Sequence, residues 1–138
     1  MRMKQTAPVN MPLEIKILRS AGTQKSEAVT IRLTGSLDTA TAPELERQLA
    51  SVFTAPVKDI IFDLAGLKFI SSAGLRVFAA ASKTLGERGG QASFINMPPQ
   101  IEMVFEVIKS LPSIAVFRDT VELDRYLALL QRNHPGAR

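Results

Sequence analysis

Two segments near the start of the chain alternate apolar and polar residues, which is the pattern of a half-buried strand. Residues 13–17 read Leu-Glu-Ile-Lys-Ile, and residues 29–34 read Val-Thr-Ile-Arg-Leu-Thr before the alternation stops at Gly35. A polar stretch that contains Gly22 joins the two segments. Alternating segments joined by a polar loop predict an antiparallel pair of strands.

Apolar residues then recur every three or four positions over residues 42–53, which predicts a helix. Thr41 lies three residues before Glu44, the spacing of a capping box. Pro43 falls in the first turn, where its missing N–H costs little. The positions expected to face the core are Leu45, Leu49 and Val52.

A short continuous apolar run, Ile60-Ile61-Phe62, follows Pro56 and predicts a strand that is covered on both faces. We expect it to be the most buried strand of the sheet. A second helix is predicted over residues 73–88, ending at Gly89-Gly90. Its expected core stripe consists of Leu75, Phe78, Ala79, Ser82 and Leu85.

The rest of the chain continues to alternate between strands and helices. It predicts a strand over residues 92–95 and a helix after Pro98-Pro99. A strand over residues 114–117 follows, and then a last helix that opens at Asp119 with Glu122 as its capping partner. The apolar positions expected to be buried in these two helices are Ile101, Val104, Phe105, Ile108, Leu123, Leu127 and Leu130.

The order β-β-α-β-α-β-α-β-α favours a single α/β domain, with a mixed sheet of four or five strands and about four helices. Crossovers through helices make the sheet largely parallel, and the first strand is its expected antiparallel member. We place the domain at residues 12–131, between flexible tails at residues 1–11 and 132–138.

The net charge of +4 originates outside the predicted domain. Residues 13–131 contain thirteen basic and thirteen acidic residues, and the excess comes from Arg2, Lys4, Arg132 and Arg138. Nucleic-acid-binding domains concentrate basic residues on their folded surface, so we expect no direct binding of nucleic acid. The absence of cysteine excludes disulfides and thiolate metal sites, and fits a cytoplasmic setting. No run approaches the roughly 18 apolar residues of a membrane-spanning helix, so we expect no membrane insertion.

Residues that enzymes commonly use are scarce. The only histidine, His134, lies in the predicted C-terminal tail. Nothing in the spacing of Asp38, Asp59 and Asp63 pairs them as a general acid and base. The glycines at residues 86–90 end a helix and do not open one, so they do not form a phosphate-binding loop. We therefore expect no enzymatic activity, no metal and no cofactor.

The segment over residues 63–77 contains features that packing alone does not explain. A buried strand ends, and Ser71 and Ser72 stand at the start of the next helix, where a serine oxygen can cap N–H groups. We expect Ser72 to be such a cap, exposed to solvent and near Asp38. Gly74 lies in the first turn, where glycine costs about 0.5–1 kcal/mol relative to alanine, which indicates a close approach by another group.

The side of this helix opposite the expected core stripe also has an unusual composition. Its first two turns are small and apolar apart from Arg76, a shape that suits the docking of another protein. An alanine-rich helix with a broad buried stripe is the alternative interpretation. The residues on this side are Arg76, Val77, Ala80, Lys83, Thr84 and Glu87.

Three motifs together resemble a known family. Residues 69–76 read Phe-Ile-Ser-Ser-Ala-Gly-Leu-Arg, after Ile-Phe-Asp-Leu at residues 61–64 and Gly-Ser-Leu-Asp at residues 35–38. They resemble the STAS domain of bacterial anti-sigma factor antagonists. The resemblance covers almost the whole chain, from about Leu13 to Leu130, in both motifs and element order.

The resemblance implies a set of site residues. When the chain is aligned on Gly74-Leu75, the serine that a partner kinase phosphorylates in the family is Ser72. Ser71 stands where family members commonly have an aspartate, and it is the second candidate for phosphorylation. The family's aspartate after glycine-x-leucine is present as Asp38. The implied partner-binding residues are Asp38, Thr39, Ser71, Ser72, Gly74, Arg76, Val77, Ala80 and Lys83.

The resemblance also implies a partner switch. The unmodified protein would bind a serine-kinase anti-sigma factor and thereby release a sigma factor. The kinase would then phosphorylate Ser72, the antagonist would dissociate, and a serine phosphatase would restore it. A phosphate adds about −1.5 to −2 charge, which a helix N-terminus tolerates but an apolar docking surface does not.

Two other functions stay open on the sequence alone. The chain could be a STAS subunit that is permanently docked in a transport or sensory assembly, and regulated phosphorylation of Ser72 distinguishes a switch from such a subunit. It could also be a small nucleotide- or ligand-binding protein, although no phosphate-binding loop supports that function.

Overall fold

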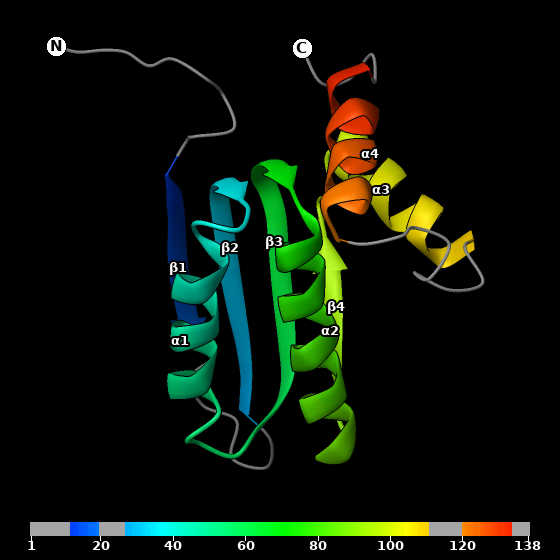
Figure 1. The fold of residues 1–138 in the computed structure, drawn as a ribbon. Coiled ribbons are helices and arrows are strands. Elements are labelled where there is room, and N and C mark those ends of the chain that lie inside the picture. Colours follow the sequence, from blue (N-terminus) through cyan, green and yellow to red (C-terminus); the bar gives the residue numbers. More distant parts are fainter. Residues whose placement is uncertain (1–11, 20–26, 111–119, 134–138) are drawn as a thin grey trace, which may run out of the picture.

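Within the residues that the computed structural model describes, which are 12–19, 27–110 and 120–133, four strands form one mixed sheet (Figure 1). The strands, in their order across the sheet, are β1 (Leu13–Arg19), β2 (Glu27–Leu37), β3 (Val57–Ile70) and β4 (Gln91–Ile95). β1 is antiparallel to β2, and the other neighbours are parallel. The predicted mixed sheet with an antiparallel first strand is confirmed. The strand predicted at residues 114–117 lies outside the described residues.

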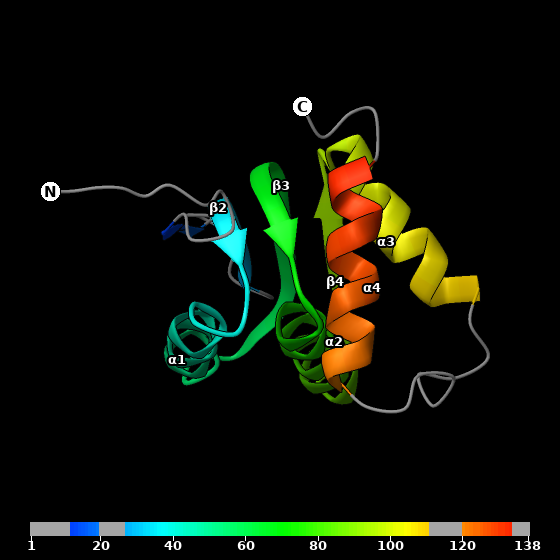
Figure 2. The same cartoon turned by 45° about the horizontal axis from the view of Figure 1, so that its top comes forward.

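Four helices accompany this sheet in the same part of the chain. They are α1 (Ala42–Val52), α2 (Ser72–Glu87), α3 (Pro99–Ser110) and α4 (Thr120–Asn133). Figures 1 and 2 show α1 and α2 side by side on one face of the sheet, with α3 and α4 on the β4 side. α4 extends two residues past the predicted boundary at residue 131, and its predicted opening at Asp119 lies outside the described residues. None of the described helices is long and apolar enough to cross a membrane.

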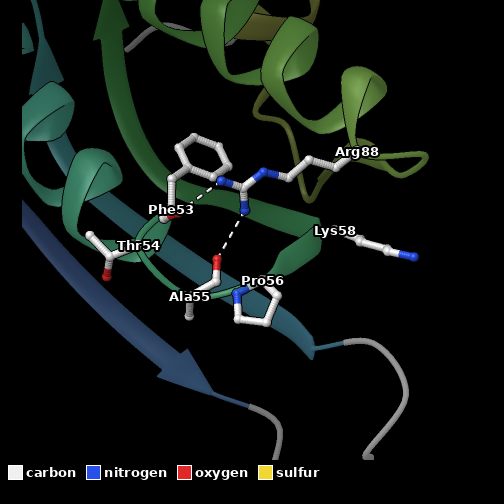
Figure 3. Close-up of a pocket in the computed structure, with 6 residues that line it drawn as sticks. All are labelled: Phe53, Thr54, Ala55, Pro56, Lys58 and Arg88. Atoms are coloured by element: carbon white, nitrogen blue, oxygen red, sulfur yellow. Dashed lines mark hydrogen bonds between the residues drawn. The ribbon is translucent and has the colours of Figure 1, made fainter.

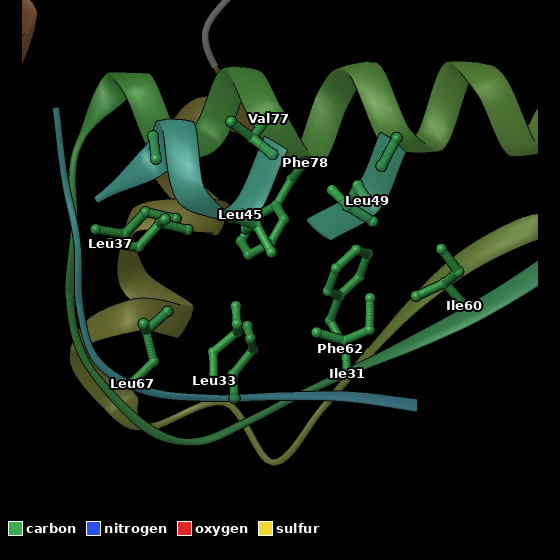
Figure 4. Close-up of a cluster of buried hydrophobic side chains, with 14 of the residues drawn as sticks. Ile31, Leu33, Leu37, Leu45, Leu49, Ile60, Phe62, Leu67, Val77 and Phe78 are labelled. Atoms are coloured by element: carbon green, nitrogen blue, oxygen red, sulfur yellow. The ribbon is translucent and has the colours of Figure 1, made fainter. Parts of the chain in front are cut away.

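The core lies between the sheet and the layer formed by α1 and α2 (Figure 4). Ile31 and Leu33 of β2 point toward these helices and are fully buried, as the alternating pattern predicts. Phe62 of β3 is also fully buried, but Ile61 beside it is only partly buried. The expectation of a strand covered on both faces is therefore wrong at Ile61, because α1 and α2 cover only one face.

Four phenylalanines connect the sheet to the helices. Phe62, Phe78, Phe94 and Phe105 come from β3, α2, β4 and α3, and the ring centroids of the pairs in contact are separated by 4.9 to 6.2 Å. Aromatic rings at these separations pack favourably in tilted or stacked arrangements. This cluster joins α3 to the sheet through contacts that the sequence pattern did not specify.

The core stripe predicted for α2 is partly wrong. Phe78 and Leu85 are buried as expected, whereas Ala79 and Ser82 are exposed. The residues of α2 that are buried are Ser72, Gly74, Val77, Phe78, Ala81 and Leu85. The buried face is shifted from the predicted stripe toward Gly74, Val77 and Ala81, because the small residues among them allow α2 to lie close to its neighbours. Leu75, on which the predicted stripe began, is only partly buried.

Candidate functional site

Two serines begin α2 at the point where β2 and β3 both end. Leu37 and Ile70 are the last residues of these strands and are partners in the sheet. The Ser71 amide donates a hydrogen bond to the Leu37 carbonyl at 2.9 Å. The Ser71 hydroxyl accepts one from the Ala73 amide at 3.2 Å and caps the helix. The expectation that Ser72 is the cap is therefore wrong, and the serine before it has that role.

Ser72 is buried, which contradicts the expectation of a solvent-exposed side chain. Only 3% of its surface is accessible, and its hydroxyl oxygen has no hydrogen-bond partner among the described residues. Its backbone amide donates a hydrogen bond to Oδ1 of Asp124 in α4 at 2.7 Å. α4 thus reaches the N-terminus of α2, and this contact between distant parts of the chain accounts for the difference from the sequence-based expectation.

A second polar side chain of α4 contacts the end of β3. Gln131 is 3% exposed; its Oε1 accepts from the Ile70 amide at 2.9 Å, and its Nε2 donates to the Ile70 carbonyl at 2.7 Å. The pairing between β3 and β4 extends only to Asp63, so the edge of β3 beyond that point needs other partners. Gln131 provides the hydrogen bonds to the Ile70 backbone that a neighbouring strand would otherwise provide.

Gly74 explains how β2 and α2 approach each other so closely. A Cβ atom at this position would lie 2.7 Å from Cγ of Leu37 and 3.0 Å from Cγ1 of Ile70. Such distances are shorter than van der Waals contact, so a side chain would push the start of the helix away from both strands. The predicted close approach at Gly74 is confirmed.

The loop after β2 lies next to this helix start because it follows Leu37 directly. Oδ1 of Asp38 accepts hydrogen bonds from the amides of Ala40 at 3.0 Å and Thr41 at 3.1 Å, which hold the turn. Thr39 at the tip is exposed. Thr41 forms no side-chain cap on α1, because its hydroxyl donates to the Ser36 carbonyl at 2.8 Å. The predicted capping box at Thr41 is therefore wrong.

The outer face of α2 is partly as predicted. Arg76, Ala80 and Lys83 are exposed, and Ala79 is exposed with them. We use the term outer face for these four residues below. Val77 is only 5% exposed and points into the core (Figure 4), so its assignment to a docking surface is wrong. It packs inward because it lies three residues after Gly74 and one before Phe78 on the buried side.

A separate polar cluster surrounds Asp63 near the end of the β3–β4 pairing. The Asp63 carboxylate accepts hydrogen bonds from Nδ2 of Asn96 at 3.1 Å, the Ala65 amide at 3.2 Å and Nε of Arg32 at 3.2 Å. These donors, with Asn96 first, lower the pKa of Asp63 below its ordinary value of 3.8. A carboxyl group held ionised in this way is a structural partner and not a general acid.

Asp59, at the other end of the β3–β4 pairing, also has a structural hydrogen bond. Asp59 accepts a hydrogen bond from the Gln91 amide at 3.1 Å, which joins β3 to the start of β4. Within the described ranges, no group of three His, Cys, Asp or Glu side chains is arranged to hold a metal ion. None of these carboxylates lies in the serine-containing helix start.

A shallow pocket of about 430 Å³ lies at the opposite end of α2 (Figure 3). Its main polar side chain, Arg88, donates hydrogen bonds to the carbonyls of Phe53 at 2.8 Å and Ala55 at 2.9 Å. It also donates to the Val57 carbonyl at 3.1 Å, and its guanidinium lies 5.0 Å from the centroid of the Phe53 ring. These contacts join the end of α1 to the end of α2, so Arg88 has a structural role here.

The fold and the helix start together define a STAS domain, and the sequence matches that family over residues 21–123. The chain belongs to the STAS domain family. BtrV of Bordetella bronchiseptica, an anti-sigma factor antagonist by name, is 35% identical over 75 residues, which cover 54% of this chain and 65% of BtrV, slightly less than two thirds of that relative. The anti-sigma F factor antagonist of Lysinibacillus sphaericus is 31% identical over 81 residues, which cover 58% of this chain and 69% of that relative.

Solved structures agree with this fold. The anti-sigma factor antagonist SpoIIAA in its unphosphorylated form superposes with a TM-score of 0.58 at 22% identity, covering 75% of this chain and 95% of SpoIIAA. An anti-sigma factor antagonist from Mycobacterium paratuberculosis superposes with a TM-score of 0.52 at 20% identity, covering 88% of this chain and 99% of that structure. The four-stranded mixed sheet with its helices is therefore the STAS fold.

Proposed function

We propose that the chain is an anti-sigma factor antagonist that binds a serine-kinase anti-sigma factor and is switched off by phosphorylation of Ser72. The observation that carries this proposal is the pair of serines at the N-terminus of α2. Ser71 caps the helix, and Ser72 adds a hydroxyl that makes no hydrogen bond to any described residue. A hydroxyl with no structural partner at a helix N-terminus is suited to accept a phosphate. The names of the curated relatives support the same role.

The partner-binding surface in this proposal combines the outer face of α2 with the loop that contains Asp38 and Thr39. The small side chains of Ala79 and Ala80 allow close approach. Arg76 and Lys83 border them, and Lys83 is paired with Glu87 at 3.1 Å. Ser71, Ser72 and Gly74 contribute by shaping the helix start below this surface. Val77 is left out because it faces the core.

The switch follows from the charge of the phosphate. A group that carries about −1.5 to −2 charge at the start of α2 must be stripped of water when a partner docks, which opposes binding. The kinase supplies ATP and magnesium, and a serine phosphatase returns the chain to its binding form. The chain is a substrate and a regulator in this cycle, with no catalytic step of its own, and we place it in the cytoplasm with its partners.

A permanently docked STAS subunit is the second candidate, and one observation favours it. Ser72 is 3% exposed, so a kinase cannot reach its hydroxyl in the arrangement described here. A subunit without regulated phosphorylation has no need for an accessible serine. The two candidates differ in whether Ser72 becomes modified while the partner is bound.

The test is to incubate the purified chain with ATP and an anti-sigma serine kinase from the organism that encodes it. The modified residue is then mapped by mass spectrometry in the unaltered chain and in the Ser72→Ala and Ser71→Ala variants. We expect phosphate on Ser72 in the unaltered chain and in Ser71→Ala, and none in Ser72→Ala. Stable binding with no phosphate on either serine would contradict the switch and favour the docked subunit.

A further inference from the structure

We propose that α4 is a displaceable cover over the phosphorylation site, held closed by Asp124 and Gln131. In this arrangement the hydroxyl of Ser72 reacts only after α4 has moved away from the N-terminus of α2. The inference rests on the proposed function for the identity of the modification. The inferred movement of α4 rests on the structure and does not depend on the proposed function.

Because Ser72 is buried, a kinase can reach its hydroxyl only if part of the structure moves away. Phosphoryl transfer requires the attacking oxygen to line up with the terminal phosphate of ATP, so the hydroxyl must enter the active site of a kinase. With 3% of Ser72 accessible and the Asp124 carboxylate 2.7 Å from its backbone nitrogen, no such approach is possible. Ser72 belongs to α2, which is built into the core, so the simplest movable part is α4.

Two polar side chains of α4 fix its position at separate points of the neighbouring structure. Asp124 bonds to the start of α2, and Gln131 bonds to both backbone groups of Ile70 at the end of β3. Leu127, between them along the helix, is fully buried in the core. On the opposite side of α4, Leu129 is 46% exposed. α4 also packs against α3 on the β4 side and contacts α2 (Figures 1 and 2).

The negative charge of Asp124 determines how phosphorylation would shift α4 between its closed and displaced positions. In the closed form its carboxylate is stabilised by the positive end of the α2 dipole. A phosphate on Ser72 would compete for the same amide groups and would repel the carboxylate. Phosphorylation would therefore keep α4 displaced, so the modified chain would differ from the unmodified one in the position of α4 as well as in charge.

The cysteine-free sequence offers a direct test, because a single introduced thiol reports its own accessibility. The Ser72→Cys variant of the full chain is reacted with the disulfide reagent DTNB under native conditions. Ser82→Cys, at an exposed position of the same helix, gives the rate for an accessible thiol. Val29→Cys, at a position of β2 that is 1% exposed, gives the rate that requires global unfolding.

Local opening of a cover predicts that Ser72→Cys reacts at least about tenfold more slowly than Ser82→Cys and at least about tenfold faster than Val29→Cys. Adding Gln131→Ala weakens the closed form relative to both the opened and the unfolded chain, so it should raise the rate of Ser72→Cys at least about threefold without removing its excess over the rate of Val29→Cys. Arg132→Ala, at the exposed neighbour of Gln131, is the matched control and should change neither rate.

Two results would overturn the proposal. A rate for Ser72→Cys equal to that of Ser82→Cys would mean that Ser72 is not covered. A rate equal to that of Val29→Cys, both with and without Gln131→Ala, would mean that α4 leaves only when the domain unfolds. Because the measurement uses neither kinase nor ATP, the cover can be supported even if no kinase modifies Ser72, and the two proposals fail separately.

Discussion

The Asp124 carboxylate accepts a hydrogen bond from the Ser72 amide at 2.7 Å, so an acidic side chain already occupies the N-terminus of α2. Negative charge is favourable at this end of a helix, and the first amides of the helix have few other acceptors. Any second negative charge added at Ser72 must share the same position. The two residues are separated by 52 positions in the chain, and this contact links the proposed modification to the placement of α4.

The first prediction tests the coupling between these two residues. Ser72→Asp should lower the free energy of unfolding by at least about 2 kcal/mol, because a second carboxylate is then placed at a buried position beside the partly buried Asp124. Adding Asp124→Asn should recover at least half of that loss, since the neutral amide removes the repulsion. Urea denaturation of the two single variants and the double variant measures the coupling. Additive losses in the double variant would show that the charges do not interact.

A second prediction separates the roles of the two serines. Ser71→Ala removes the cap of α2 and should lower the free energy of unfolding by about 0.5–2 kcal/mol. Ser72→Ala removes a buried hydroxyl that has no hydrogen-bond partner among the described residues, so it should be neutral or slightly stabilising. Thermal denaturation followed by circular dichroism compares the two variants. An equal loss in both would show that Ser72 also caps the helix.

The third prediction concerns two glycines in the same helix. Gly74→Ala should destabilise the domain by about 1–3 kcal/mol, because the added methyl group overlaps the Leu37 side chain. Gly86→Ala is the matched control: nothing lies within 4 Å of its added carbon, so it should stabilise the helix by about 0.5–1 kcal/mol. Chemical denaturation measures both. Opposite signs are the expected result, and destabilisation in both variants would contradict the packing described at Gly74.

The fourth prediction follows from the lowered pKa of Asp63. A carboxyl group whose pKa is lowered by folding stabilises the folded state. This stabilisation is complete above the ordinary carboxyl pKa, and it is lost as the pH falls through the pKa of the group in the folded state. Asn96 donates the hydrogen bond that contributes most to this shift, and its φ of 59° is one that glycine adopts without strain. Asn96→Gly should therefore cost about 1–2 kcal/mol near pH 7, with the difference from the unaltered chain shrinking below about pH 4.

The control for this pH dependence is to repeat the comparison with Asp63→Asn in both chains. With no carboxyl group to titrate at position 63, the effect of Asn96→Gly should be the same at all pH values between about 2 and 7. Free energies of unfolding, measured by urea titration at several pH values across this range, give this comparison. A pH-dependent difference that persists without the carboxyl group would assign the effect to another residue.

Much of the fold could be predicted because local patterns determine it. Alternation at residues 13–17 and 29–34 identified the antiparallel pair, and helical spacing over residues 42–53 identified α1. The close approach at Gly74 was also recognisable, because glycine is unfavourable in a helix unless something requires it. In each case the signal lies within one segment of the sequence.

The site was harder to predict because its geometry depends on contacts between distant segments. Asp124 and Gln131 look like ordinary polar residues of a terminal helix, and nothing in their spacing indicates that they reach Ser72 and Ile70. The burial of Ser72 follows from those contacts. Val77 was assigned to the wrong side of α2 because the predicted stripe included Ala79 and Ser82, whereas close packing at Gly74 and Ala81 brings Val77 to the buried face.

The central claim is that phosphate on Ser72 ends the binding of a serine-kinase anti-sigma factor. The most direct measurement is the affinity of that partner for the chain before and after stoichiometric phosphorylation of Ser72, by titration calorimetry without ATP. We predict that phosphorylation weakens binding at least about 100-fold, or about 2.7 kcal/mol, and that phosphatase treatment restores it. Equal affinity of the two forms would contradict the account.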